Sequence, residues 1–163
     1  MKYLAIDTSG TYLTAAVNID GKIYGGFHPD CGLQHSVTMM PEIDKALKES
    51  GYTIADLDFI AVTVGPGSFT GIRIGVSAVK AFAYAYNKKV LPLTSFDTIA
   101  YNKEGGKVLA IVDARHDNFY ACGYIDKKIS IKPCFIDGQK LDELSKEYAV
   151  LSFAPIEGHD CEV

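Results

Sequence analysis

The chain has 163 residues, of which 48% are hydrophobic and 22% charged, and its formal net charge is −4. This length suits one domain or two small lobes of an ordinary globular protein, and the acidic balance argues against a stand-alone nucleic-acid binder, which needs a basic face. No apolar run approaches the roughly 18 residues of a membrane span and no signal-peptide pattern opens the sequence, so we expect a cytoplasmic protein without membrane contact.

The chain begins with a predicted three-stranded unit. Tyr3–Asp7 is a nearly continuous apolar run, as in a buried central strand. Leu13–Ile19 and Lys22–Phe27 flank Asp20-Gly21, a dipeptide that favours a two-residue hairpin turn. Asp7-Thr8-Ser9 at the end of the first strand allows two interpretations. Its carboxylate and hydroxyls suit Mg²⁺ or phosphate, and they equally suit a turn held by side-chain hydrogen bonds.

A helix follows from about Ser36 to Ser50, with Ser36 or Thr38 as its N-cap and Gly51 after its end. Its apolar stripe consists of Met39, Met40, Ile43, Ala46 and Leu47. His35 stands at the helix entrance. No nucleophile or carboxylate accompanies it in the sequence, so we expect it to hold a backbone group rather than to act as a general base.

The next predicted strand, Phe59–Val64, leads into the glycine-rich segment Gly65–Gly75 and then into a helix, Ile72–Tyr86. A glycine loop before a helix can cradle a phosphate. However, a P-loop carries a lysine directly after its last glycine, and here Ile72 follows Gly71. The glycines are equally compatible with a tight turn and close packing.

The helix Ile72–Tyr86 is apolar on almost every side. Its polar stripe consists only of Arg73, Ser77, Lys80 and Tyr84. A helix of this kind is buried on more than one side. It is therefore either a wholly intramolecular core helix or a helix that offers its remaining apolar face to a partner.

The rest of the chain predicts a second, shorter lobe, which begins with β-strands and continues with a helix. We expect a division near Glu104–Lys107, which gives domains 1–104 and 105–163. Asp113–Asp117 is interpreted as a charged hairpin turn. The remaining predicted elements are strand Lys89–Leu93, a short helix capped by Ser95, strands Val108–Asp113, Phe119–Asp126 and Ile129–Phe135, helix Leu141–Tyr148 and strand Ala149–Phe153.

The four cysteines and four histidines do not have the spacing of a metal site. The sequence contains no Cys-x-x-Cys, and no two histidines stand four residues apart on a helix face. We expect free thiols, no bound metal and no catalytic residue.

Several of these segments together resemble the TsaB (YeaZ) family, the bacterial proteins of tRNA threonylcarbamoyladenosine biosynthesis. Gly65–Gly75 is the most specific of them, and the resemblance covers roughly the first 125 residues and thins out after that. The other segments are Leu4–Ser9, His35-Ser36, Met39–Ile43, and Asp113-Ala114-Arg115 with Tyr120.

The resemblance implies an α/β fold of the actin-like, ribonuclease-H-like type, which belongs to the glycoprotease-like branch of the actin, Hsp70 and sugar-kinase superfamily. The first lobe should hold a mixed five-stranded sheet with helices, and the second should be an abbreviated lobe of the same type. Family members usually continue through further strands and a helix, whereas this sequence stops at Val163.

The implied function is that of a non-catalytic scaffold and activator in the complex that forms N6-threonylcarbamoyladenosine next to the anticodon in tRNAs. The implied partners are a TsaD-like catalytic paralogue and a TsaE-like ATPase, with a homodimer when the chain is alone and tRNA met only through the complex. No cofactor of its own is expected, and ATP or ADP is a candidate ligand only within the complex. The catalytic paralogue carries a His-x-x-x-His metal pair, whereas here Met39 follows His35 at that spacing.

In the family the first two helices form the partner contact. Glutamate at Gly75 or Ile43 should then abolish partner binding while the lobe still folds. The implied interface residues are Met39, Met40, Ile43, Leu47, Ile72, Gly75, Val76, Val79 and Ala83.

Two rival functions stay open at this point. The first is an autonomous nucleotide-binding ATPase with Asp7, Ser9, Gly67 and Ser68 near phosphate. The second is a glycoprotease-type peptidase, which the sequence supports with neither a metal pair nor a nucleophile–base pair.

Overall fold

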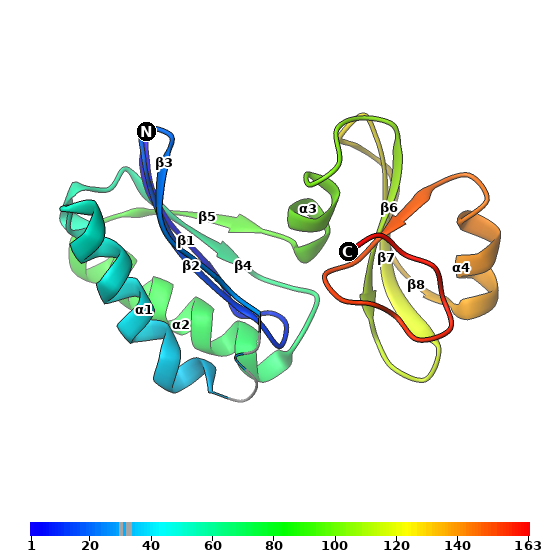
Figure 1. Cartoon of the computed structure of the whole chain (residues 1–163), viewed down its shortest axis with the longest axis horizontal. Coiled ribbons are helices and arrows are strands. Elements are labelled where there is room, and N and C mark those ends of the chain that lie inside the picture. Colours follow the sequence, from blue (N-terminus) through cyan, green and yellow to red (C-terminus); the bar gives the residue numbers. More distant parts are fainter. Residues whose placement is uncertain (30, 32–33) are drawn as a thin grey trace. The chain divides into compact units, whose positions relative to one another are not determined.

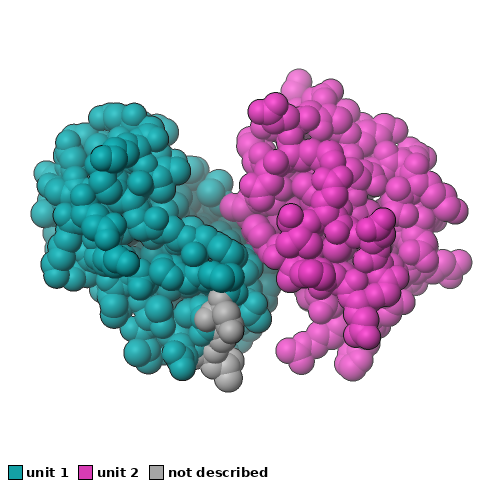
Figure 2. All heavy atoms as spheres, viewed as in Figure 1, with its two compact units in different colours: residues 1–93 teal, residues 94–163 magenta. Residues whose placement is uncertain are grey.

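The computed structural model describes residues 1–29, 31 and 34–163 (Figure 1). The chain forms two compact units, Met1–Leu93 and Thr94–Val163, which Figure 2 shows in different colours. This division lies before α3 (Ser95–Ala100), earlier than the expected one at 104/105. The reason is packing, because Phe96 and Ile99 of α3 are buried in the core of the second unit.

The first unit is built on a five-stranded mixed sheet with the order β3-β2-β1-β4-β5. β1 pairs antiparallel with β2 and parallel with β4, and β5 lies parallel to β4 at the edge. The predicted hairpin turn is confirmed, since Asp20 and Gly21 both have positive φ angles. The strands are β1 (Lys2–Asp7), β2 (Leu13–Ile19), β3 (Lys22–His28), β4 (Phe59–Thr63) and β5 (Lys89–Leu93).

Two long helices, α1 (His35–Ser50) and α2 (Phe69–Tyr86), cover one face of this sheet (Figure 1). A short 3-10 turn, Ile54–Asp56, precedes β4. The core between helices and sheet is aliphatic, with Leu4, Leu13 and Ile60 fully buried. Burying such a side chain completely contributes about 1.5–3 kcal/mol, so this layer supplies much of the stability of the first unit.

Four helix starts differ from the prediction. Neither Ser36 nor Thr38 caps α1, because the carbonyl of Gln34 already accepts the amides of Val37 and Thr38 and closes the first turn. α2 begins at Phe69, earlier than Ile72, because the Ser68 hydroxyl accepts a hydrogen bond from the Gly71 amide.

For α3 a neighbouring residue acts as the cap. Thr94 rather than Ser95 caps α3, and it forms a reciprocal pair of hydrogen bonds with Asp97.

The second unit contains a four-stranded sheet with the order β8-β7-β6-β9. Its three antiparallel strands and one parallel strand repeat the β3-β2-β1-β4 part of the first sheet. α3 packs on one face, while α4 (Gly138–Leu144) packs on the other. The predicted helix Leu141–Tyr148 is thus displaced, because Asp137 caps the helix at its start. The strands are β6 (Lys107–Asp113), β7 (Asn118–Ile125), β8 (Lys128–Asp137) and β9 (Ala149–Leu151).

Candidate functional site

The glycine loop packs directly on the end of β1. The Ser68 amide donates a hydrogen bond of 2.6 Å to the carbonyl oxygen of Ser9. A Cβ atom at Gly67 would collide with that same oxygen, and one at Gly71 would collide with the carbonyl oxygen of Thr8. Both neighbours are backbone atoms that cannot swing aside. The loop therefore needs glycine for close approach of two backbones.

Thr8 fixes the first turns of α2 on the strand. Its hydroxyl donates to the Gly71 carbonyl oxygen at 2.8 Å and is buried. A Cβ atom at Gly75, one turn further along, would press on the same hydroxyl. The Ser68 hydroxyl accepts from the Gly71 amide at 3.2 Å. Two of the amide groups that a phosphate would use at this helix end, those of Ser68 and Gly71, therefore already have protein partners.

The Asp7 carboxylate is buried in the turn that follows β1. Its two oxygens accept hydrogen bonds from the Ser9 amide at 2.8 Å and from the Tyr12 hydroxyl at 3.5 Å. Burial raises the pKa of Tyr12 far above its ordinary value, and the charge of Asp7 adds to this shift. The phenol therefore stays neutral and can keep donating to the carboxylate.

His35 contributes to the same network from the first turn of α1. Its Nε2 lies 2.8 Å from the carbonyl oxygen of Tyr12, and the imidazole is buried. This is the backbone-holding role that the sequence predicts for His35. Tyr12, which joins Asp7, Ser9 and His35, was not among the predicted site residues, because nothing in its sequence context marks it as polar and buried.

The four residues predicted near a nucleotide do lie together in the first unit. However, Asp7, Ser9, Gly67 and Ser68 contact one another through the hydrogen bonds and backbone packing described above. The four residues thus form the packing contact between the end of β1 and the start of α2.

The residues predicted for a partner interface fall into two groups. Met39, Ile43, Gly75 and Val79 are buried in the first unit, the three side chains among them at 1–3% exposure. We therefore expect glutamate at Gly75 or Ile43 to disrupt the fold itself, and not to leave the lobe folded. The accessible group consists of Met40, which is 45% exposed, and the half-buried Leu47, Ile72, Val76 and Ala83.

An apolar groove of about 410 Å³ runs between α1 and α2. Met40 and Leu47 line it from the first helix, and Phe82 and Tyr86 line it from the second. Tyr86 is 47% exposed. An apolar groove that is lined by partly exposed side chains is a candidate for a protein–protein contact. Phe82 and Tyr86 were not among the residues predicted for this surface.

Other kinds of site find less support in the described part of the chain. Among residues 1–29, 31 and 34–163, no three His, Cys, Asp or Glu side chains gather as they would around a metal ion. Of the helices in these same residues, none combines the length and apolar character that a membrane crossing requires.

Comparisons with known proteins agree on one family. The family model described as tRNA N6-adenosine threonylcarbamoyltransferase (TsaD) matches residues 13–152. The tRNA threonylcarbamoyladenosine biosynthesis protein TsaB of Escherichia coli is 32% identical over 128 residues, which cover 76% of this chain and 55% of the relative. TsaB of Bacillus subtilis is 34% identical over 122 residues, which cover 74% of this chain and 53% of the relative. The chain thus spans about half the length of the curated relatives it matches.

A solved structure gives the same result for the fold. YeaZ from Pseudomonas aeruginosa superposes with a TM-score of 0.75 at 26% sequence identity, and the match covers 83% of this chain and 66% of that one. The mixed sheet with its two covering helices is therefore an α/β lobe of the actin-like type.

Proposed function

This chain belongs to the TsaD family, tRNA N6-adenosine threonylcarbamoyltransferase, in its TsaB (YeaZ) branch, and we propose that it is a non-catalytic subunit in the formation of N6-threonylcarbamoyladenosine next to the anticodon of tRNAs. Its relatives from Escherichia coli and Bacillus subtilis are named as proteins of that biosynthesis. The chain works in the cytoplasm and reaches tRNA only through its partners. It needs no cofactor of its own, and any ATP or ADP is bound by the complex.

The observation that carries the non-catalytic assignment is the hydrogen bond from the Ser68 amide to the Ser9 carbonyl. A phosphate held at the start of α2 would need the backbone amides of this loop to be free. Here the loop and the turn after β1 contact each other, and the Asp7 carboxylate is engaged by the Ser9 amide and the Tyr12 hydroxyl. This geometry weighs against an autonomous ATPase.

A peptidase role finds equally little support. Proteolysis needs an activated nucleophile or a set of metal ligands around a water molecule. His35 is committed to the Tyr12 carbonyl, and within residues 1–29, 31 and 34–163 no carboxylate or thiol is bonded to its Nε2.

The function that the surface supports is docking through α1 and α2. We assign the groove around Met40, Leu47, Phe82 and Tyr86 to a TsaD-like catalytic paralogue, or to a second copy when the chain is alone. Each fully buried side chain would contribute about 1.5–3 kcal/mol before the cost of association, so a few suffice for a specific complex. A TsaE-like ATPase would join the resulting pair.

The experiment that tests this function mixes the purified chain with the TsaD-like paralogue of the same organism. Size-exclusion chromatography should show a complex that is larger than either component. Separate elution at micromolar concentrations, with and without tRNA, would refute the proposed subunit role.

A further inference from the structure

The segment from Ser152 to Val163 closes one side of the second unit. β9 is the last strand of its sheet, and the segment lies along its outer edge, where Glu162 forms a parallel bridge with Leu151. The Ser152 amide donates to the Glu162 carbonyl at 3.0 Å, and the Glu162 amide donates to the Val150 carbonyl at 2.9 Å. The edge of β9, which would otherwise expose unpaired backbone groups, is therefore occupied by the segment.

One side chain anchors this segment to the body of the unit. His159 places Nε2 2.7 Å from the carboxylate of Asp117, in the turn between β6 and β7, and Nδ1 3.3 Å from the carboxylate of Asp142 on α4. Its ring meets Phe119 of β7 edge-on, with 5.2 Å between ring centroids. Only 12% of the side chain is exposed.

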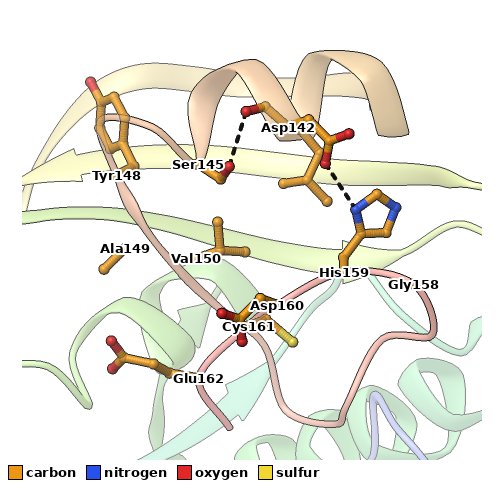
Figure 3. A pocket seen from close by; sticks show the side chains of 11 residues that line it. Asp142, Ser145, Tyr148, Ala149, Val150, Gly158, His159, Asp160, Cys161 and Glu162 are labelled. Carbon is orange, nitrogen blue, oxygen red and sulfur yellow. Dashed lines mark hydrogen bonds and ion pairs between the residues drawn. The ribbon is translucent and has the colours of Figure 1, made fainter.

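Figure 3 shows how Asp142 points from α4 toward His159 across a pocket of about 370 Å³. The segment supplies one wall of this pocket with Gly158–Glu162, while Leu141, Asp142 and Ser145 supply another. His159 therefore ties together three parts of the unit, namely the β6–β7 turn, α4 and the segment itself.

The charges around the ring favour its protonated form. A neutral imidazole has one N–H, whereas an imidazolium has two and can donate to Asp117 and Asp142 at once. In the described part of the chain, the charged groups that contact the ring are the carboxylates of Asp117 and Asp142, and β7 contributes the apolar Phe119. Asp160 is its neighbour on the segment. The hydrogen bond to Asp117 is the main reason that the pKa of His159 is raised above its ordinary value of 6.5.

We propose that His159 is a pH-sensitive clasp, which in its protonated form holds the segment 152–163 against α4 and the edge of β9, and which on losing its proton releases that edge. Because the folded state holds the proton more tightly than the free segment does, the stabilisation is fully present below pH 6.5 and is lost as pH rises through the higher pKa of the closed state. A second ion pair, between Lys103 and Glu162, also holds the segment.

Amide hydrogen exchange of Ser152 and Glu162, corrected for the intrinsic pH dependence of exchange, measures the clasp directly. Between pH 6 and pH 9 the protection of both amides should fall roughly threefold or more. His159→Asn should give low protection that no longer depends on pH. The matched control is His116→Asn, in the exposed β6–β7 turn, which should behave like the unaltered chain.

Two further variants separate the clasp from a general loss of folding. Lys103→Met should lower the protection by a similar factor at both pH values and leave the pH dependence intact. Asp142→Asn, at a largely exposed position, should move the fall in protection to lower pH without unfolding the chain. Protection that is independent of pH in the unaltered chain would overturn the proposal, and so would equal protection in His159→Asn.

Discussion

The backbones of Ser9 and Ser68 are joined by a 2.6 Å hydrogen bond, although one residue follows β1 and the other precedes α2. This hydrogen bond holds the loop before α2 against the turn that follows β1. The glycine loop therefore has a packing role. Its Ser68 and Gly71 amides donate to protein oxygens, whereas a phosphate-binding loop keeps such amides free for the ligand.

The first prediction concerns the glycine that lies closest to the strand. Gly71→Ala places a methyl group on the carbonyl oxygen of Thr8, and a backbone atom cannot yield without moving α2. We expect a loss of about 1–3 kcal/mol in the free energy of unfolding, as for other overpacked sites. Urea denaturation measures it. Gly26→Ala is the matched control, because a Cβ atom there meets nothing within 4 Å. Equal stability of the two variants would show that the close approach is unimportant.

The second prediction concerns the hydroxyl of Thr8. Thr8→Val keeps the shape of the side chain and removes the hydrogen bond to the Gly71 carbonyl. The buried carbonyl oxygen then loses its partner. The free energy of unfolding of the variant should therefore be about 1–3 kcal/mol lower than that of the unaltered chain. Thr11→Val, in an exposed position of the same turn, should change stability little. If Thr8→Val is as stable as the Thr11 variant, this hydrogen bond does not hold the helix in place.

The third prediction addresses nucleotide binding. Titration of the purified chain with Mg-ATP in a calorimeter should show no saturable heat, because the Ser68 and Gly71 amides and the Asp7 carboxylate are engaged within the protein. Saturable binding that disappears in Asp7→Asn would contradict this and would restore the autonomous ATPase.

The sequence predicted those elements whose cause is local. Asp20-Gly21 defines its hairpin because the turn itself requires positive φ, and β1 is recognisable from its continuous apolar run. The start of α1 was missed because Gln34 caps it through its carbonyl group and without a side-chain hydrogen bond. Such a cap has no residue signature.

The remaining differences depend on tertiary contacts. α3 follows β5 directly in the chain, but its buried Phe96 packs with the second sheet, which a composition-based boundary cannot reveal. Likewise, Ile43 and Val79 belong to the same apolar stripes as their accessible neighbours. The period of a helix indicates which residues share a face, and only the packed structure shows where the core ends on that face.

Substitutions on the exposed side of α1 and α2 test the proposed docking of the TsaD-like paralogue. Met40→Glu introduces a charge into the groove at a side chain that is 45% exposed, so the fold should survive while docking is lost. Ile129→Glu makes the same type of change on β8 in the second unit, where the side chain is 57% exposed.

The most direct measurement is the dissociation constant between this chain and the TsaD-like paralogue, determined by calorimetry for the unaltered chain and for both variants. We predict binding by the unaltered chain and by Ile129→Glu, and a loss of about tenfold or more with Met40→Glu, since desolvating an unpaired charge costs at least about 1.4 kcal/mol. Equal affinity of all three proteins, or no binding by the unaltered chain, would contradict this prediction.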